Sequence, residues 1–276
     1  MKLQVASKKK VKLRMSLSSP TGFGKTYSAL LLAFGITNDW GKIAVIDTEN
    51  ESASLYSDLG QYYTLPISPP FTPEKYMEAI KACEDSGIEV IIIDSVTHVW
   101  SGEGGLLEYN SSLGGRYQDW AKTTPRYQKW LNSILQSKCH VITTIRKKQA
   151  YEMSKENGKT IVEKKGMEDE VRGGFDYEMT IALELVNEKH LAKASKDRTR
   201  LFDNIPEFII TPETGKLINK WCESGVNPVD LALNILRASN TIDELQESWK
   251  VIGKDMQSQP EVIVAKEEMK TKLTVA

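Results

Sequence analysis

Apolar runs of strand length alternate with segments of helical periodicity along most of the chain. The strand candidates are Val11–Ser18, Lys42–Asp47, Glu89–Asp94, His140–Ile145, Tyr177–Leu185 and Phe208–Thr211. Helical patterns lie between several of them, at Tyr27–Phe34, Pro73–Asp85 and Pro125–Gln136. Strands that alternate with helices favour an α/β fold, in which a mostly parallel sheet is flanked by helices on both faces.

Two long segments show neither pattern. Gly102–Lys122 contains two Gly-Gly pairs, and Lys147–Gly174 is polar and highly charged. Long loops inside a compact domain are usually functional or disordered. Both segments are therefore candidates for contact with a ligand or partner.

The pattern changes after Trp221, where only helical segments follow. These are Pro228–Ala238, a segment with a capping-box start at Thr241 and Glu244, and Pro260–Lys272. A capping box marks the first turn of a helix. We predict a core domain over residues 1–224 and a small C-terminal helical region over residues 225–276.

Composition narrows the class of protein only slightly. The 36 Lys and Arg residues nearly balance the 37 Asp and Glu residues, so whole-chain charge says nothing about a polyanionic partner. The three cysteines and three histidines are scattered without CxxC spacing, which indicates neither disulfides nor a zinc site. No run approaches the roughly 20 apolar residues of a membrane span, and no apolar stretch follows the lysine-rich start, Met1–Lys12. We expect an unprocessed cytoplasmic chain that does not contact a membrane.

The stretch Ser19–Thr26 (SPTGFGKT) fits the phosphate-binding pattern GxxxxGK[ST], with Ser19 in place of the first glycine. In this motif backbone N–H groups cradle the phosphates, Lys25 reaches the β- and γ-phosphates, and the Thr26 hydroxyl ligates Mg²⁺. The predicted nucleotide-binding residues are Ser19, Pro20, Thr21, Gly22, Phe23, Gly24, Lys25, Thr26 and Tyr27. A glycine turn that opens a core helix is the alternative interpretation, but the position between a predicted strand and a predicted helix favours the phosphate site.

Two carboxylates follow apolar strands. Asp94 ends the run IIID, where it can hold Mg²⁺ or its water, and Glu49 follows the strand that ends at Asp47. The carboxyl ends of parallel strands meet at one edge of a sheet, so Glu49 can orient the water that attacks the γ-phosphate. From spacing alone, a turn-capping aspartate and an exposed loop glutamate remain alternatives.

The order GKT, IDTE, IIIDS, VITTIR and a long charged loop resembles the RecA-like recombinase ATPases over Val11–Trp221. More narrowly, it is similar to phage-encoded, single-domain RecA-like annealing proteins, often described as AAA-type ATP-binding proteins. The resemblance implies a P-loop ATPase with a RecA-like core that uses ATP and Mg²⁺. It also implies that Glu49 is the catalytic base, that Asp94 with Ser95 forms the Walker B element, and that Thr144 holds the γ-phosphate sensor position, where the recombinases carry glutamine.

In that family two loops on the inner face of an oligomer bind single-stranded DNA, and they correspond to the two unassigned segments. The candidate DNA-binding residues are Arg116, Tyr117, Trp120, Lys122, Lys147 and Lys148. In the first segment, aromatic rings interleaved with cations suit base stacking and phosphate contact. The second segment is basic only locally, so without the resemblance a solvated charged hairpin remains an alternative for it. Lys196 and Arg198 resemble the basic pair that recombinases project onto the ATP of the neighbouring subunit, which implies a homo-oligomer with ATP at its interfaces.

The sequence thus predicts an ATP-hydrolysing RecA-like protein that binds single-stranded DNA in phage-type recombination or strand annealing, in the host cytoplasm if it is phage-encoded. A P-loop kinase, a non-hydrolysing ATP switch and a helicase-type motor remain alternatives. A GTPase is disfavoured because the nearest match to NKxD, at Asn219–Cys222, lacks the aspartate. The C-terminal helices could dock on the core, mediate oligomerisation or recruit a single-strand-binding protein.

Overall fold

The computed structural model describes residues 8–156, 159–225 and 228–275, with the side chains of residues 151–162 and 275 left aside. Residues 1–7 of the lysine-rich start lie outside this description. Contacts divide the chain into two compact units, Lys12–Asn219 and a second unit in which Lys220–Ala276 joins Met1–Val11. The described residues 8–11 thus belong to the second unit. The contacts divide the chain between Asn219 and Lys220 and do not test a boundary near Gly225, which stays a prediction.

The core unit is built on one mixed sheet, in the order β3-β2-β4-β5-β1-β7-β8-β9 with β6 paired to β5. Its strands are β1 (Arg14–Ser19), β2 (Ile43–Asp47), β3 (Tyr63–Pro66), β4 (Val90–Asp94), β5 (His140–Glu156), β6 (Lys159–Asp169), β7 (Ile181–Leu185), β8 (Leu191–Asp197) and β9 (Phe208–Ile209). Neighbours from β3 to β7 along this order are parallel, whereas β6, β8 and β9 are antiparallel to their neighbours. The predicted α/β fold with a mostly parallel sheet is confirmed.

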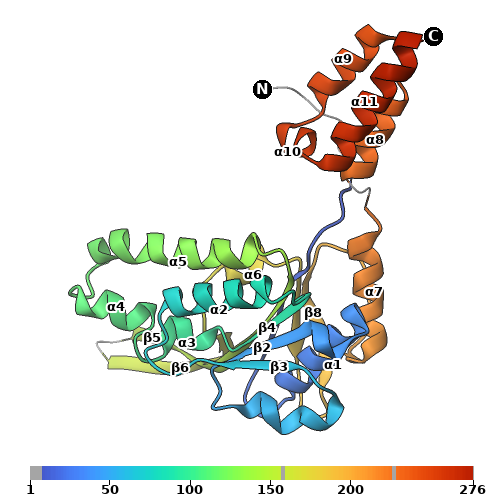
Figure 1. Cartoon of the computed structure of the whole chain (residues 1–276). Helices are drawn as coiled ribbons and strands as arrows, with labels where there is room; N and C mark the ends of the chain where they lie inside the picture. The colour runs from blue at the N-terminus through green and yellow to red at the C-terminus, as the bar shows by residue number, and fades with distance from the viewer. Residues whose placement is uncertain (1–7, 157–158, 226–227, 276) are drawn as a thin grey trace. The chain divides into compact units, whose positions relative to one another are not determined.

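Helices cover both faces of this sheet (Figure 1). The helices of the core unit are α1 (Lys25–Thr37), α2 (Pro73–Asp85), α3 (Thr97–Ser101), α4 (Leu106–Ser112), α5 (Trp120–Leu135), α6 (Phe175–Glu178) and most of α7 (Pro212–Glu223), with short 3₁₀ helices η1 (Trp40–Lys42), η2 (Ser52–Leu59) and η3 (Tyr117–Asp119). Helices α2 and α5 pack together over one face, and α1 packs on the other against the central strands. Burial on both faces explains why the central strands β2 and β4 are continuous apolar runs up to their final aspartates.

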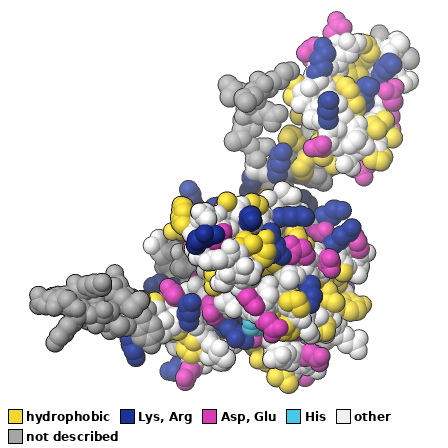
Figure 2. Space-filling model, turned by 90° about the vertical axis from the view of Figure 1, so that its left-hand side faces the viewer, with side chains coloured by type: hydrophobic (Ala, Val, Ile, Leu, Met, Phe, Trp, Pro, Cys, Tyr) yellow, Lys and Arg dark blue, Asp and Glu magenta, His cyan; other side chains and the backbone are white. Residues whose placement is uncertain are grey.

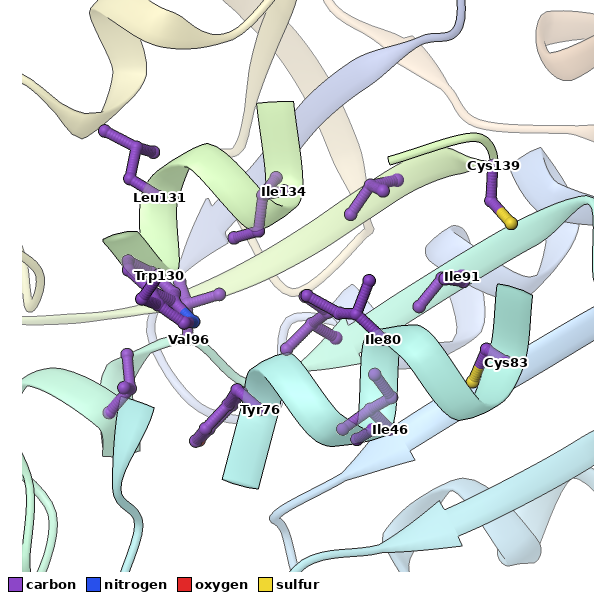
Figure 3. Close-up of a cluster of buried hydrophobic side chains, with 14 of the residues drawn as sticks. Ile46, Tyr76, Ile80, Cys83, Ile91, Val96, Trp130, Leu131, Ile134 and Cys139 are labelled. Carbon is purple, nitrogen blue, oxygen red and sulfur yellow. The ribbon is translucent and has the colours of Figure 1, made fainter. Parts of the chain in front are cut away.

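Figure 3 shows how α2 and α5 attach to the sheet. Tyr76 and Ile80 lie one helical turn apart on α2, and Trp130 and Ile134 lie one turn apart on α5. All four side chains are at most 2% exposed and belong to one apolar cluster with the strand residue Ile91. The i, i+4 spacing places each pair on the helix face that meets the strands. This cluster attaches α2 and α5 to the face of the sheet that contains β2 and β4. The two predicted carboxylates lie at the end of β4 and just after the end of β2.

The two unassigned segments prove to be regular structure. Gly102–Lys122 contains α4, η3 and the first turn of α5, which begins at Trp120. Asn110 donates a hydrogen bond to Thr123 at 3.0 Å and ties α4 to α5. Most of the described part of Lys147–Gly174 forms an antiparallel hairpin of β5 and β6, which extends β5 beyond the core sheet. This agrees with the alternative of a solvated charged hairpin, which the sequence left open because polar strands have no apolar face to reveal their period.

Smaller differences concern the ends of elements. The strand expected from Tyr177 begins at Ile181, because Tyr177 belongs to the short helix α6. Strand β3 and helix α7 were not predicted at all. Only short or weakly apolar segments form them, so periodicity could not separate them from loops.

The C-terminal unit has its own core. Its helices are α8 (Pro228–Arg237), α9 (Ile242–Val251), α10 (Lys254–Gln257) and α11 (Pro260–Val275). Leu236, Leu245 and Val262 are at most 3% exposed and form one cluster. The Thr241 hydroxyl accepts a hydrogen bond from the Glu244 backbone at 3.2 Å, so the predicted helix start is present. Across the described residues, no helix combines the length and the apolar character that a membrane span requires.

Two glycines let α1 and α7 approach closely within the core unit. A Cβ atom added to Gly35 would lie 2.0 Å from the Pro212 carbonyl oxygen, and one added to Gly215 would lie 2.3 Å from the Leu32 carbonyl oxygen. Real Cβ atoms do not approach backbone oxygens so closely, so either side chain would force the helices apart. The packing of α7 on the P-loop helix therefore depends on these two positions.

We expect Gly35→Ala to lower the free energy of unfolding by about 1–3 kcal/mol, the usual cost of overpacking a close-packed contact. Urea unfolding of the whole chain measures the effect. Gly173→Ala is the matched control, because an added Cβ meets nothing within 4 Å there, and its effect should stay within about 0.5 kcal/mol. Equal stability of the two variants would contradict the proposed close packing.

Candidate functional site

The P-loop joins the end of β1 to the start of α1. Gly22 and Gly24 adopt φ angles of 88° and 86°, a left-handed region that other residues rarely enter. The Lys25 ammonium donates to the Ser19 carbonyl at 3.0 Å and to the Pro20 carbonyl at 2.9 Å. These contacts hold the ammonium over the loop, at the positive end of α1, where anions bind favourably.

A pocket of 470 Å³ opens at this loop. Its lining residues are Thr21, Gly22, Gly24, Lys25, Thr26, Tyr27, Glu49, Ser52, Tyr56, Asp94, Arg146 and His190. Of the nucleotide-binding residues predicted from the motif, Ser19, Pro20 and Phe23 lie in the same loop but are not among these lining residues. The fold therefore brings Glu49, Asp94 and the P-loop into one pocket, as the strand order predicts.

Asp94 lies at the end of β4 and is 2% exposed. Thr26 of the P-loop donates to its Oδ2 atom at 2.5 Å, and Thr144 of β5 donates to its Oδ1 atom at 2.5 Å. Burial raises the pKa of Asp94, while the hydrogen bonds from Thr144 and Thr26 oppose that rise. A hydroxyl and a carboxylate oxygen at this distance, beside the phosphate loop, form a donor set that fits Mg²⁺.

The position of Thr144 differs from the expectation that it senses the γ-phosphate. Thr144 is fully buried, contacts Asp94 and does not line the pocket. The register explains why, because Thr144 pairs with Leu17 inside the sheet whereas Arg146 pairs with Ser19 at the start of the P-loop. At about 3.3 Å per residue, the two positions lie one pleat apart. Arg146, which sequence reasoning missed, is the residue of this strand that reaches the pocket.

Glu49 stands on a turn that Asp47 organises. The Asp47 carboxylate accepts hydrogen bonds from the backbone of Glu49 at 2.7 Å and of Ala53 at 2.9 Å. The Oε1 atom of Glu49 accepts from the Ser95 hydroxyl at 2.9 Å and from Arg146 Nε at 2.9 Å, and Arg146 Nη2 contacts its Oε2 atom. The glutamate side chain is only 15% exposed, so these partners fix its position inside the pocket.

Two further lining residues come from distant parts of the chain. His190 lies in the turn between β7 and β8, and its Nδ1 atom is 2.8 Å from the Phe23 carbonyl oxygen of the P-loop. Tyr56 of η2 makes an edge-to-face contact with Tyr27, with ring centroids 5.7 Å apart. Nothing in the local sequence distinguishes His190 or Tyr56 from surface residues, so only the folded chain reveals them.

Lys196 and Arg198 lie far from the P-loop of their own chain. Strand β8 runs antiparallel to β7, and Lys196 pairs with Ala182 near the start of β7. That start lies at the edge of the sheet opposite the P-loop, because β7 and β1 are parallel. Lys196 and Arg198 both donate to the Tyr177 carbonyl oxygen. The structure therefore does not bring this basic pair into the pocket of the same chain.

The first predicted DNA segment presents part of its candidate set to solvent. Arg116 and Lys122 are exposed, and Tyr117 is 94% exposed. Trp120 instead stacks on Trp100, with ring centroids 5.9 Å apart. One side of the Trp120 ring is therefore covered by a contact within the fold. The segment keeps an exposed aromatic ring and two exposed cations on its surface, and one of these, Arg116, lies 3.7 Å from the Asp119 carboxylate.

The second segment is less basic than its lysines suggest. Lys147 is 12% exposed and pairs with Glu184 at 2.7 Å and with Asp169 at 3.7 Å, so it is not a free cation. Lys148 is half exposed and lies 3.8 Å from Glu168. Basic and acidic side chains are also interspersed on the face of the molecule that Figure 2 shows. The predicted DNA contact of Lys147 therefore loses its support, because the lysine would have to break two ion pairs.

One comparison with known proteins identifies a family for most of the chain. Residues 11–208 match the family model AAA_24, described as an AAA domain. No curated protein matches the chain. Among solved structures, the chain is similar to a KaiC-like protein from the hyperthermophilic archaeon Pyrococcus horikoshii OT3, with 16% identity and a TM-score of 0.40 over 73% of this chain and 87% of that one.

Burial lowers the pKa of Lys25 from 10.5 to about 8; Asp94 opposes the shift and Arg146 adds to it. The ammonium therefore loses its proton as the pH rises through about 8. Because phosphates favour the charged form, we expect nucleotide affinity to fall by up to about tenfold per pH unit above that value. Titrations with a fluorescent nucleotide at pH values from 7 to about 9 measure the effect.

Lys25→Arg is the control, because a guanidinium stays charged throughout this range. Its affinity for the nucleotide, whatever its absolute value, should not follow the same pH dependence. A wild-type affinity that stays constant through this range would contradict the lowered pKa.

Proposed function

The chain belongs to the AAA_24 family of AAA-domain proteins and has a RecA-like P-loop α/β fold, and we propose that it hydrolyses ATP in a Mg²⁺-dependent reaction. We further propose that it binds single-stranded DNA and acts as a homo-oligomer in phage-type homologous recombination or strand annealing. The observation that carries the enzymatic part is the meeting of Lys25, the Thr26–Asp94 pair and Glu49 in one pocket. The P-loop residues, Asp94 and Glu49 come from three parts of the chain, and each supplies a different requirement of phosphoryl transfer.

The roles follow from the geometry. Backbone N–H groups of the P-loop and the Lys25 ammonium bind the phosphates and hold them in position. When bound beside Thr26 and Asp94, Mg²⁺ would neutralise charge on the phosphate oxygens. Glu49 orients a water molecule and accepts its proton as the water oxygen attacks the γ-phosphorus. The bond from the γ-phosphorus to the bridging oxygen breaks, and ADP leaves with the electron pair.

We expect Glu49→Gln to lower kcat by roughly 10²- to 10⁴-fold, the usual loss when a general base is removed. Release of phosphate from ATP measures the effect. Glu51→Gln is a suitable control, because this nearby exposed glutamate does not line the pocket. A turnover of Glu49→Gln within a few-fold of wild type would reassign the water-orienting role to another group.

The position of Lys196 and Arg198 supports assembly. A basic pair at the opposite edge of the sheet cannot contact the phosphates of its own chain, but it can be presented to a neighbour. Burial lowers the pKa of Lys196 and the Arg198 charge adds to this effect, whereas Asp176 and Glu178 oppose it. An anion placed beside the two cations would offset their mutual repulsion. Such a cation supplied in trans stabilises charge that develops on the γ-phosphate.

Mixing two inactive variants tests this dependence on assembly. Lys25→Ala lacks the phosphate-binding charge, and the double variant Lys196→Ala/Arg198→Ala lacks the basic pair. We expect loss of the trans cation to lower the turnover by about 10³-fold. In mixed oligomers some interfaces combine an intact P-loop with an intact basic pair, so ATPase activity should partly return. If mixed oligomers form and the activity does not rise, the basic pair does not act in trans.

DNA binding is supported by the exposed segment that carries Arg116, Tyr117 and Lys122. The experiment that best tests the proposed function is ATP turnover with and without single-stranded DNA. Stimulation by DNA favours the recombinase class, whereas turnover that requires a small-molecule acceptor favours a P-loop kinase. Strand separation coupled to turnover would instead identify a helicase-type motor.

We expect Tyr117→Ala to weaken binding of a single-stranded oligonucleotide by about 1–3 kcal/mol, the usual contribution of one stacked base. The dependence of affinity on salt should stay the same, because stacking releases no counterions. Fluorescence anisotropy across a salt series measures both quantities. Tyr63→Ala is the control, since Tyr63 is also well exposed but lies on β3. Equal affinities of the two variants would remove Tyr117 from the DNA surface.

A further inference from the structure

His98 lies beside the proposed base without lining the pocket. It belongs to the first turn of α3, which follows β4. Its Nδ1 atom is 4.0 Å from Oε1 of Glu49 and 2.8 Å from the hydroxyl oxygen of Thr48. The imidazole stacks on the ring of Phe71, with centroids 4.8 Å apart, and the His98 side chain is only 17% exposed. A largely buried titratable group thus lies close to the carboxylate that we propose as the base.

Thr48 connects His98 to the turn that carries Glu49. The Thr48 backbone N–H donates to the Asp94 carbonyl oxygen at 2.7 Å, and the Thr48 hydroxyl oxygen accepts from the Ser95 backbone N–H at 2.8 Å. The hydroxyl proton can go to His98 Nδ1 at 2.8 Å, or to the carbonyl oxygens of Asp94 and Ser95 at 3.2 and 3.3 Å. The shortest of these contacts makes Nδ1 the acceptor, which places the ring proton on Nε2 and leaves the imidazole neutral.

The charged and titratable groups around Thr48 and His98 come from separate elements. They are Asp94 of β4, Glu49 after β2, Arg146 of β5, Glu170 after β6 and Tyr76 of α2. Burial lowers the pKa of His98, whereas the charges of Asp94 and Glu170 oppose that effect. The neutral imidazole is therefore the favoured form at neutral pH. It takes up a proton only when the pH falls through a value below the ordinary 6.5.

Protonation of His98 would change the surroundings of Glu49. A charged imidazole carries a proton on both ring nitrogens, so Nδ1 becomes a donor and no longer accepts from Thr48. It also places a positive charge 4.0 Å from the Glu49 carboxylate, which already pairs with Arg146. A further opposite charge stabilises the ionised carboxylate and makes it a weaker base. Glu49 therefore depends on a neutral imidazole at this position.

We propose that His98 is a positioning residue for Glu49, which supports turnover when it is neutral and stops turnover when it is protonated. This inference rests on the proposed ATPase function. In the neutral form the imidazole holds the Thr48 hydroxyl, and with it the start of the turn that carries Glu49. Glu49 then takes the proton of the attacking water, and His98 neither gives nor takes a proton in this step. In the charged form the imidazolium attracts the Glu49 carboxylate and competes with the water.

The pH dependence of kcat at saturating ATP and Mg²⁺ tests the proposal. In wild type we expect kcat to fall by up to about tenfold per pH unit below the pKa of His98. His98→Asn keeps an acceptor near the Nδ1 position but takes up no proton, so its loss of kcat, relative to its own plateau, should begin about half a pH unit lower or more. His140→Asn is the matched control, because His140 is also buried and accepts at Nδ1, from the Leu13 N–H at 3.2 Å, outside the pocket. If kcat falls at the same pH in wild type and His98→Asn, the proposal is wrong.

A second variant separates positioning from packing. His98→Phe keeps a ring that stacks on Phe71 but offers the Thr48 hydroxyl no acceptor. We expect its kcat to fall by about threefold or more below that of His98→Asn, with the KM for ATP changed by less than about twofold. Equal kcat values for the two variants would show that the contact with Thr48 does not position Glu49.

The titration of His98 gives a readout that does not depend on turnover. If charged His98 pairs with Glu49, then Glu49→Gln should lower the pKa of His98 by about 0.5 or more, as followed by NMR of the imidazole. Glu51→Gln is the control, because Glu51 is exposed and does not line the pocket. An unchanged pKa of His98 in Glu49→Gln would overturn the proposal. Absence of ATP turnover in wild type would instead contradict the proposed ATPase function, and the titration would still test the charge coupling.

Discussion

The buried carboxylate of Asp94 holds together the parts of the core on which the site depends. It accepts hydrogen bonds from Thr26 at the start of α1 and from Thr144 in the middle of β5, and so it links three elements that are far apart in sequence. A carboxylate that leaves water needs such partners to offset its desolvation. The P-loop helix is therefore positioned by the same group that is available to hold a metal ion. The close packing of α7 on α1 secures this helix from its other side.

A second constraint is the order of the parallel strands. Strand β5 lies between β1 and β4, so its end faces both the P-loop and the Asp94 carboxylate. Strand β2 lies beside β4 and delivers Glu49 to the same edge. The position of Arg146 follows directly, because β5 continues past the sheet into the hairpin and Arg146 is the residue at which it leaves. One strand thus connects the pocket to the hairpin.

The main elements and the chemistry of the phosphate site could be predicted from the sequence. Continuous apolar runs revealed β2 and β4, since strands covered on both faces have no polar period, and shorter apolar-leaning runs revealed β1 and the first part of β5. For Lys147–Gly174 a solvated hairpin stayed an open alternative, and the short helices of Gly102–Lys122 were not predicted, because exposed strands and short helices carry little hydrophobic periodicity. The charges of the second segment were also misleading, since Lys147 is neutralised by Glu184, a residue of another strand.

The sequence by itself determined the local chemistry of this protein: a glycine loop between a strand and a helix, a lysine and a hydroxyl that follow it, and two carboxylates at strand ends. Those features depend on neighbours along the chain, so spacing is enough to define them. Which side chains meet was decided by the tertiary structure alone. Thr144 is buried one pleat below the pocket while Arg146 reaches it, and His190 contacts the P-loop from a distant turn. Register and strand order place these residues, and both result from packing between segments that are distant in sequence.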